Sequence, residues 1–231
     1  SQNFLTDKNI SRKIINQKNI KNKLVLEIGP GYGFMTDNIL ENNPKKILLI
    51  EKDDELVNFL RNKYKYNSKI EIIGNDIFNF DFKEFKNLII ISNLPYNVGT
   101  KIILYLFNFN KNISEMIFMI QKEVAIKFNY NLPRMNKYKF LTQIVSKFSN
   151  CFEVSSKVFF PIPKIKSYVV KFQFKKNKLN LSKAKKFSDL IFKNVRKKIY
   201  NNLEIKIGNN LLNKRVNQLN IDELISIYDL F

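Results

Sequence analysis

The sequence contains no histidine, and Cys151 is its single cysteine. One thiol cannot form an intrachain disulfide or a cysteine-built metal site, so the cysteine usage suits a reducing compartment. Histidine is the usual general base and the usual zinc ligand, so this chain must perform any chemistry by other means. We therefore expect no metal ion and no histidine-based catalysis.

Long apolar runs are also missing. No stretch of about 18 apolar residues occurs, so we expect no transmembrane span. The residues Ser1 to Leu5 lack the basic and apolar regions of a secretory signal. We expect a cytoplasmic protein, with the mitochondrion or plastid as the alternative if a targeting segment has been removed. Nothing in the sequence indicates an obligate dimer, so a monomer is expected.

Acidic residues are scarce. The chain has 20 Asp and Glu against 40 Lys and Arg, which gives a formal charge of +20 and a pI near 9.8. A coding bias toward Lys and Asn would raise the lysine content, but it would not explain the shortage of acidic residues. A surplus of this size attracts polyphosphate strongly and with a steep dependence on salt. The charge therefore favours a nucleic-acid partner, although it names no activity.

The first two-thirds of the chain alternates short apolar runs with helical patterns. Strands are expected at 24–28, 46–51, 69–74, 88–91 and 116–120, and helices at 54–64 and about 102–109. Near-continuous apolar strands separated by helices are typical of a parallel sheet that is covered on both faces. The predicted fold class is α/β with a mostly parallel, Rossmann-like sheet.

The pattern changes after Ser149. Segments 154–160 and 168–174 look like two strands that pair antiparallel across Pro161 and Pro163. The polar, basic stretch 175–178 is the best candidate boundary, and the residues beyond it follow helical spacing. We therefore predict a catalytic domain over residues 1–176 and a small all-α domain over residues 177–231.

A glycine-rich turn follows the first expected strand, in Glu27-Ile28-Gly29-Pro30-Gly31-Tyr32-Gly33. Its glycines allow a tight turn and a close approach of the backbone to a ligand, which could be a dinucleotide or S-adenosylmethionine. Glu51 ends the second strand, where it can bind ribose hydroxyls, and Asp76 follows the third, where it can accept from an adenine amine. Either carboxylate alone could be a helix N-cap. Together the three features favour a nucleoside-cofactor site, because ligands bind at neighbouring strand ends.

The fourth expected strand ends in Ser92-Asn93-Leu94-Pro95-Tyr96. An exocyclic amine is a poor nucleophile because its lone pair is delocalised into the ring. The side-chain oxygen of Asn93 and the backbone carbonyl of Leu94 are acceptors that can hold both N–H bonds of such an amine. Pro95 removes a competing N–H donor, and Tyr96 can stack on an extruded base.

This chemistry needs no histidine, because the amine loses its proton only after it gains a methyl group. The rate would come mainly from holding the reacting atoms in line. The Asn-Leu-Pro-Tyr motif alone indicates methylation of an amine on adenine, cytosine or an amide. An ordinary turn at the end of a strand is the alternative.

Together with further segments, the two motifs resemble the rRNA adenine N6,N6-dimethyltransferase family, and within it the bacterial small-subunit dimethyladenosine transferases. Residues 2–7 match the family's Q-N-F-L-x-D, 121–125 its Q-K-E-V-A, and 159–167 its F-x-P-x-P-K-V-x-S. Residues 194–203 resemble the basic helix of its C-terminal domain. The resemblance covers nearly the whole chain.

This resemblance implies S-adenosylmethionine as the methyl donor. It implies transfer to the N6 amines of two adjacent adenosines near the 3′ end of small-subunit rRNA, within a pre-ribosomal 30S-type particle. The base site would be formed by Asn93, Leu94, Pro95, Tyr96 and Phe159, with a buried core aromatic as the alternative at Phe159. Cofactor contacts are implied from Asn3, Leu5, Gly29, Gly31, Glu51, Asp76, Ile77 and Asn93.

Four positions depart from the family's usual pattern: Ser92 and Lys139 replace Gly, Gly99 replaces Ser, and Lys166 replaces Asp. Two other functions stay open. A large-subunit rRNA adenine methyltransferase of the antibiotic-resistance type shares the fold but more often has Ile at position 94. A ribosome-assembly or transcription factor of the same fold would bind RNA without catalysis.

Overall fold

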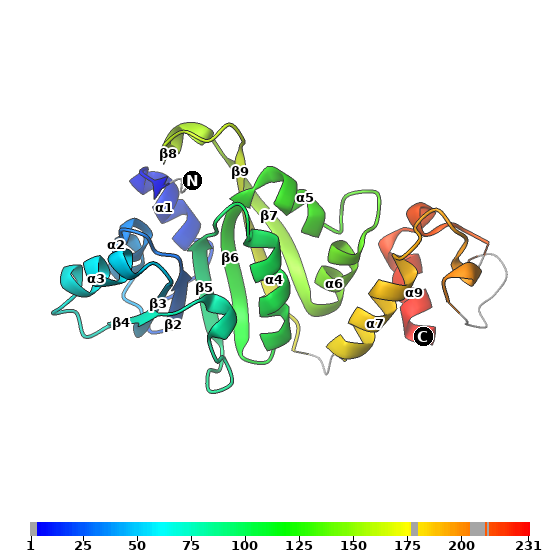
Figure 1. Cartoon of the computed structure of the whole chain (residues 1–231), viewed down its shortest axis with the longest axis horizontal. Coiled ribbons are helices and arrows are strands. Elements are labelled where there is room, and N and C mark those ends of the chain that lie inside the picture. The colour runs from blue at the N-terminus through cyan, green and yellow to red at the C-terminus, as the bar shows by residue number, and fades with distance from the viewer. Residues whose placement is uncertain (1–3, 177–179, 204–210, 212) are drawn as a thin grey trace. The chain divides into compact units, whose positions relative to one another are not determined.

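The computed structural model describes residues 4–176, 180–203, 211 and 213–231 (Figure 1). The chain forms two compact units: unit 1 comprises 1–125 and 149–174, and unit 2 comprises 126–148 and 175–231. Within the described ranges, no helix is both long and apolar enough to cross a membrane. In the same ranges, no three His, Cys, Asp or Glu side chains lie close enough together to hold a metal ion.

The central sheet has seven strands in the order β4-β3-β2-β5-β6-β9-β7. Strands β2 to β6 pair in parallel, and β9 pairs antiparallel with β6. The five parallel strands expected from the sequence are confirmed. They are near-continuous apolar runs because both of their faces are buried. The strands are β2 (Leu24–Ile28), β3 (Lys46–Glu51), β4 (Ile70–Gly74), β5 (Leu88–Asn93), β6 (Ile113–Gln121), β7 (Ser146–Val154) and β9 (Ser167–Phe174).

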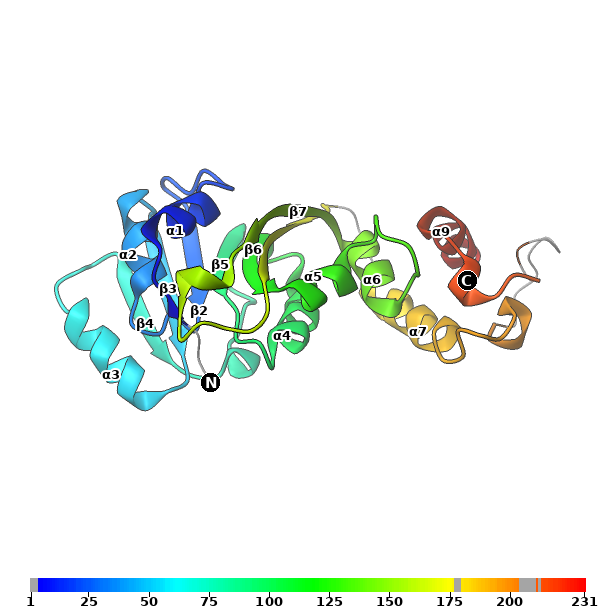
Figure 2. The ribbon, with the colours of Figure 1, turned by 90° about the horizontal axis from the view of Figure 1, so that it is seen from above.

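Helices cover both faces of this sheet, with α1 and α2 on one side and α4 on the other (Figure 2). Successive strand residues point to opposite faces, and Val25, Ile47 and Ile89 lie in one core with apolar residues of α1, α2 and α3. On the opposite face, the ring of Phe107 contacts that of Phe172, with centroids 5.9 Å apart. The helices are α1 (Lys8–Ile15), α2 (Phe34–Glu41), α3 (Asp54–Lys63), α4 (Gly99–Leu106) and α5 (Lys122–Phe128).

The segment 154–160 differs from the prediction. It was expected to be one strand, but β7 ends at Val154 and a 3-10 turn occupies Ser156–Val158. The side chain of Ser155 accepts a hydrogen bond from the Lys157 N–H and so starts this turn. Strand β8 (Phe159–Phe160) then pairs antiparallel with β1 (Phe4–Leu5), outside the central sheet. The prediction of a strand over 154–160 was therefore wrong.

Unit 2 is held together by aromatic rings from three helices. Phe140 contacts Phe187 with ring centroids 5.1 Å apart, and both rings contact Tyr228 at 5.4 Å. Phe231 adds a contact with Phe187 at 5.3 Å. The helical spacing predicted around Phe187 and over 221–230 is confirmed. The elements are α6 (Lys137–Val145), α7 (Leu181–Ile191), α9 (Ile221–Leu230) and 3-10 turns at Ile199–Asn201 and Val216–Gln218.

Two features of unit 2 differ from the sequence predictions. Residues 126–148 were assigned to the catalytic domain, but they belong to unit 2 because α6 packs on α7 through Phe140. The segment 194–198 was expected to continue a basic helix. It forms turns instead and leads into a bridge between Lys198 and Arg215.

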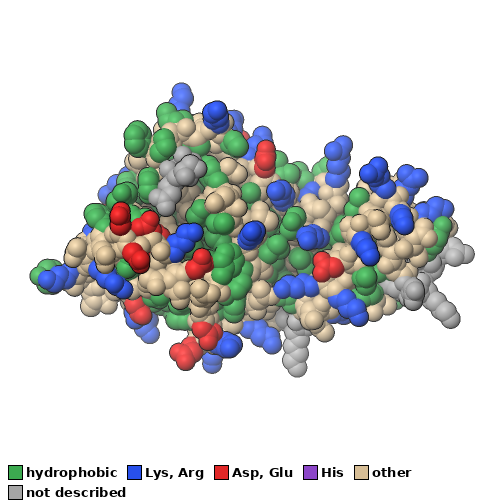
Figure 3. All heavy atoms as spheres, viewed as in Figure 1, with side chains coloured by type: hydrophobic (Ala, Val, Ile, Leu, Met, Phe, Trp, Pro, Cys, Tyr) green, Lys and Arg blue, Asp and Glu red, His purple; other side chains and the backbone are tan. Residues whose placement is uncertain are grey.

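Unit 2 carries most of the positive charge. Its sequence has 18 Lys and Arg against 5 Asp and Glu, which is a surplus of 13 of the chain's +20. On the face drawn in Figure 3, Lys and Arg side chains gather over this unit. A surface of this kind attracts phosphate backbones.

The aromatic cluster predicts which residues of α7 determine the stability of unit 2. Phe187 is fully buried, so Phe187→Ala should lower the free energy of unfolding by about 3–5 kcal/mol. Leu190 on the same helix is 37% exposed, and Leu190→Ala should cost less than about 1 kcal/mol. Urea unfolding followed by circular dichroism measures both changes. Equal effects of the two substitutions would contradict the assigned core.

Candidate active site

The loops that follow β2, β3, β4 and β5 are joined by hydrogen bonds. The Gly29 N–H donates to the Ile50 carbonyl at 2.8 Å, and the Asn75 N–H donates to the Glu51 carbonyl at 3.0 Å. The buried Ser92 hydroxyl donates to the Ile28 carbonyl, which ties β5 to β2. Because the carboxyl ends of parallel strands lie at one edge of a sheet, these loops form a single rim.

The glycine turn has the backbone that its composition predicts. Gly29, Gly31 and Gly33 have φ values of 62°, 58° and 78°, in the left-handed region where other residues are strained. No atom lies within 4 Å of the position that a Cβ at Gly29 would take. A Cβ at Gly31 would lie 3.0 Å from the Phe4 ring. The turn is therefore open to a ligand at Gly29 and covered by Phe4 at Gly31.

Glu51 is held at the glycine turn by backbone donors. Its Oε1 accepts from the N–H groups of Lys52 and Asp53 at 2.9 and 3.2 Å, and its Oε2 accepts from the Gly31 N–H at 3.4 Å. The side chain that caps α3 is that of Asp53. The N-cap alternative for Glu51 is therefore wrong, and its carboxylate belongs to the rim.

Asp76 has the capping role that was the alternative to cofactor binding. Its Oδ1 accepts from the Phe78 N–H at 3.0 Å and starts the 3-10 turn Ile77–Asn79. Because a carboxylate has two oxygens, this bond leaves the second one available to a ligand. Asp76 follows Asn75, which bonds to Glu51, so the two carboxylates lie on adjacent strand ends. Ile77 is 5% exposed and adds an apolar wall beside them.

The Asn-Leu-Pro-Tyr motif links the end of β5 to α4. Asn93 is the last residue of β5 and pairs with Met119, and the Leu94 N–H donates to the Met119 carbonyl at 3.1 Å. The Leu94 side chain is buried, whereas Pro95 is exposed. The Pro95 carbonyl accepts from the Gly99 N–H at 3.1 Å, at the first residue of α4. The strand pairing and the helix start therefore fix the course of the motif.

Tyr96 has a partner that the sequence did not single out. Its hydroxyl lies 3.1 Å from the Oγ of Ser167, the first residue of β9. Burial raises the pKa of Tyr96, so its phenol stays neutral at physiological pH. Ser167 is the last residue of the 159–167 segment that matches the family pattern. That match was the sequence signal that could have identified Ser167 as a site residue. The contact brings the Asn-Leu-Pro-Tyr motif and the 159–167 segment together.

Phe159 is brought to the N-terminal segment. It pairs with Leu5 in the β1–β8 sheet, and the Thr6 N–H donates to the Val158 carbonyl at 2.9 Å. The Phe159 side chain is 2% exposed and lies in the hydrophobic core, as the alternative for this residue supposed. Its contact with a base stays a prediction. Asn3, also predicted to contact the cofactor, lies outside the described residues.

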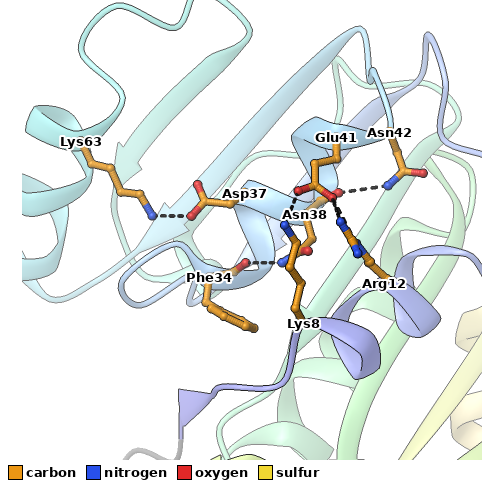
Figure 4. Close-up of polar contacts among 8 residues, drawn as sticks. All are labelled: Lys8, Arg12, Phe34, Asp37, Asn38, Glu41, Asn42 and Lys63. Atoms are coloured by element: carbon orange, nitrogen blue, oxygen red, sulfur yellow. Dashed lines mark hydrogen bonds and ion pairs between the residues drawn. The ribbon is translucent and has the colours of Figure 1, made fainter.

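A buried acidic group beneath the glycine turn was missed by the sequence interpretation. Glu27 is 2% exposed, burial raises its pKa to about 8, and the Thr36 hydroxyl donates to its Oε2 at 2.6 Å. The next residue, Asp37, forms an ion pair of 2.7 Å with Lys63 (Figure 4). Asp37 also accepts from the Tyr64 hydroxyl at 2.6 Å. These residues fix α2 directly after the turn. Thr36 and Asp37 in the first turn of that helix were the available clue.

The four departures from the family pattern have local explanations. Ser92 forms the bond to β2 described above. A Cβ at Gly99 would lie 3.8 Å from that of Leu94, so this position also accommodates the usual Ser. Lys139 is buried, and its Nζ donates to three loop carbonyls at 2.6 to 3.2 Å. Lys166 forms an exposed ion pair of 2.6 Å with Glu153. None of the four departures therefore changes an acceptor of the Asn-Leu-Pro-Tyr motif.

A glycine turn after β2, an acidic residue at the end of β3 and Asn-Leu-Pro-Tyr after β5 define a Rossmann-like methyltransferase. The chain belongs to the ribosomal RNA adenine dimethylase family, whose model matches residues 1–229. It is 39% identical over 209 residues to the ribosomal RNA small subunit methyltransferase A of Malacoplasma penetrans, covering 87% of this chain and 75% of that protein. It is 34% identical to the protein of that name from Mycoplasmopsis synoviae, covering 98% and 93%.

Two solved structures share the fold over nearly their full length. The 23S rRNA methyltransferase ErmE has a TM-score of 0.81 at 19% identity and covers 98% of both chains. A dimethyladenosine transferase from Plasmodium falciparum has a TM-score of 0.80 at 19% identity, covering 97% of this chain and 95% of that one. The two proteins have different names and nearly equal scores, so these likenesses concern the fold alone.

The raised pKa of Glu27 predicts a pH dependence of stability. Between the ordinary glutamate pKa of 4.5 and about 8, the folded state holds a proton that the unfolded state has lost, so stability falls as the pH rises. Glu27→Gln removes this titration. The wild-type chain should therefore lose roughly 2–4 kcal/mol of unfolding free energy relative to this variant between about pH 5 and about pH 8. Urea unfolding at both pH values checks this, and parallel profiles would refute it.

Proposed function

We propose that the protein transfers methyl groups from S-adenosylmethionine to the N6 amines of two adjacent adenosines near the 3′ end of small-subunit rRNA. The product is N6,N6-dimethyladenosine, formed during ribosome biogenesis. The observation that best supports this proposal is the position of Asn93. It ends β5 on the same rim as the glycine turn and Glu51. The small-subunit substrate is supported by the names of the relatives with 39% and 34% identity.

The rim fits S-adenosylmethionine. The open space beside Gly29 admits a ligand against the backbone, and Glu51 is held where it can accept from ribose hydroxyls. Asp76 can accept from the adenine amine with its second oxygen, beside the apolar Ile77. Leu5 is buried in the hydrophobic core next to this site, and its contact with the cofactor is part of the proposal. When bound, the cofactor supplies an electrophilic methyl group on a sulfonium.

The chain's own residues orient the target amine. The Asn93 side-chain oxygen and the Leu94 carbonyl accept its two N–H bonds, and Pro95 contributes no competing donor. Tyr96 stacks on the base, with its hydroxyl fixed by Ser167. Phe159 is the second proposed wall, and its 2% exposure means that the segment covering it must shift when a base enters. The amine loses its proton after methylation, so water suffices as the acceptor.

Unit 2 is proposed to bind the RNA backbone. Its surplus of 13 positive charges makes affinity for rRNA strongly dependent on salt. The turns at 194–198, with Arg196, Lys197 and Lys198 all exposed, present part of this charge. We propose that the partner is a pre-ribosomal 30S-type particle and that the enzyme acts as a monomer in a reducing compartment.

The substrate is tested by mapping the methylated product. The protein is incubated with labelled S-adenosylmethionine and ribosomal subunits from a strain that lacks the modification. Mass spectrometry of nuclease fragments should place the label on two adjacent adenosines of small-subunit rRNA. Label confined to large-subunit rRNA would support the antibiotic-resistance type of activity and refute this proposal. Absence of label from any RNA would indicate a binding factor without catalysis.

The role of Asn93 is tested by substitution. Asn93→Ala removes one acceptor from the target amine, so methyl transfer should fall roughly 100- to 1,000-fold while cofactor affinity falls less than about tenfold. Asn97→Ala is the matched control, because Asn97 is exposed in the turn that follows. Radiolabel transfer measures activity, and calorimetry measures cofactor binding. Normal turnover of Asn93→Ala would overturn the assignment.

A further inference from the structure

The segment from β8 to the start of β9 (residues 159–166) exposes large apolar side chains beside the candidate active site. Phe160 is 72% exposed and Ile162 is 66% exposed. In Figure 1 this segment projects beyond the end of the central sheet, and in Figure 3 hydrophobic and basic side chains meet on the projection. Single exposed apolar residues are common, but two large ones on one projection (Phe160 and Ile162, here called the apolar tip) indicate a binding role.

The charges around these residues favour a polyanion. Lys157 and Lys164 are exposed on either side of the apolar tip. The sequence from 155 to 168 contains no Asp or Glu. Lys166 is already paired with Glu153, so Lys157 and Lys164 are the cations of the tip. A partner with a phosphate backbone therefore suits this projection better than a protein partner whose surface lacks acidic residues.

Both ends of the projection are anchored to the candidate active site. At its start, the Thr6 N–H bonds to the Val158 carbonyl at 2.9 Å, and Phe160 pairs with Phe4, whose ring covers Gly31. At its end, Ser167 lies 3.1 Å from the Tyr96 hydroxyl. The Lys166 carbonyl accepts from the backbone N–H that follows β6, at 3.0 Å. These bonds therefore fix the position of the projection relative to the Asn-Leu-Pro-Tyr motif.

Strand alternation gives the two neighbouring phenylalanines different environments. Successive side chains of a strand point to opposite faces, so Phe159 is buried while Phe160 points outward. An aromatic side chain held outward beside lysines can stack between bases, in the way that apolar wedges enter nucleic acids. The wedge would occupy stacking space that an extruded base leaves behind.

We propose that Phe160 and Ile162 form an apolar wedge that enters the RNA strand next to the target adenosine and stabilises its extruded state. Lys157 and Lys164 contact the phosphates on either side. This inference rests on the proposed function, because it assumes that an adenosine must leave its stack to reach Asn93. It adds positioning residues that act on the neighbouring bases and do not touch the reacting amine.

The test separates base extrusion from binding and from chemistry. Small subunits are reconstituted with 2-aminopurine in place of a target adenosine. The fluorescence of 2-aminopurine rises when this base leaves its stack. Phe160→Ala, Ile162→Ala and the double variant are compared with Tyr66→Ala, a control that removes an aromatic residue 92% exposed elsewhere in unit 1. Phe160→Trp tests rescue by another stacking side chain. Methyl transfer to unmodified subunits, subunit affinity and cofactor affinity are measured in parallel.

The wedge variants should lower the extruded fraction and methyl transfer together. We expect losses of roughly 10-fold for Phe160→Ala and up to about 100-fold for the double variant, with subunit affinity changed less than about 3-fold. Cofactor affinity should stay unchanged, Tyr66→Ala should behave as wild type, and Phe160→Trp should restore most of the signal. Ile162→Ala keeps the β1–β8 pairing intact and gives the same test independently of Phe160.

Three outcomes would overturn the inference. Wild-type fluorescence and turnover in the double variant would show that the tip does not act on the stack. A fall in subunit affinity as large as the fall in turnover would identify a docking surface, for RNA or for a ribosomal protein. Failure of the wild-type enzyme to methylate small-subunit rRNA would remove the proposed function and the wedge with it. The first two outcomes leave the proposed function intact.

Discussion

Backbone hydrogen bonds between neighbouring strand ends hold the glycine turn, Glu51 and Asn93 at one edge of the sheet. The bonds from Gly29 to Ile50 and from Leu94 to Met119 continue the strand ladders just beyond the strands. A slip of one residue would turn every side chain of a strand to the opposite face. Both faces are packed against helices, so such a slip would force each side chain into a space shaped for another one. The packing of the sheet thereby fixes the position of each polar group on the rim.

The two units divide the charge of the chain in a way that suits two different ligands. Unit 1 has 22 Lys and Arg against 15 Asp and Glu, and several of its acidic groups lie at the ends of β3 and β4. These carboxylates can accept from the hydroxyls and amine of a nucleoside, and they do not repel a cationic sulfonium. Unit 2 holds the excess of positive charge that a polyanion requires. The unit with the larger positive surplus is thus the one with few carboxylates to oppose an RNA backbone.

Much of the sheet and its rim could be predicted because the relevant patterns are local. Apolar runs marked the strands, and Glu51 was conspicuous as an acidic residue that ends one of them. The contacts that could not be predicted join distant residues. Tyr96 meets Ser167, and α6 completes its core with α7 through Phe140 and Phe187. Composition also misled: residues 154–160 are rich in β-formers, yet the Ser155 cap turns the chain out of the sheet.

The pairing of β1 with β8 joins the first described residues to residues near position 160. During translation, the N-terminal segment has no strand partner until β8 has been synthesised. Leu5 and the Phe4 ring over Gly31 are therefore placed late, after the strands that carry the glycine turn, Glu51 and Asn93 can already have paired. A nascent chain that stops before β8 would contain nearly every polar group of the site and still leave it open on one side. Completion of the site thus reports that most of the chain has been made.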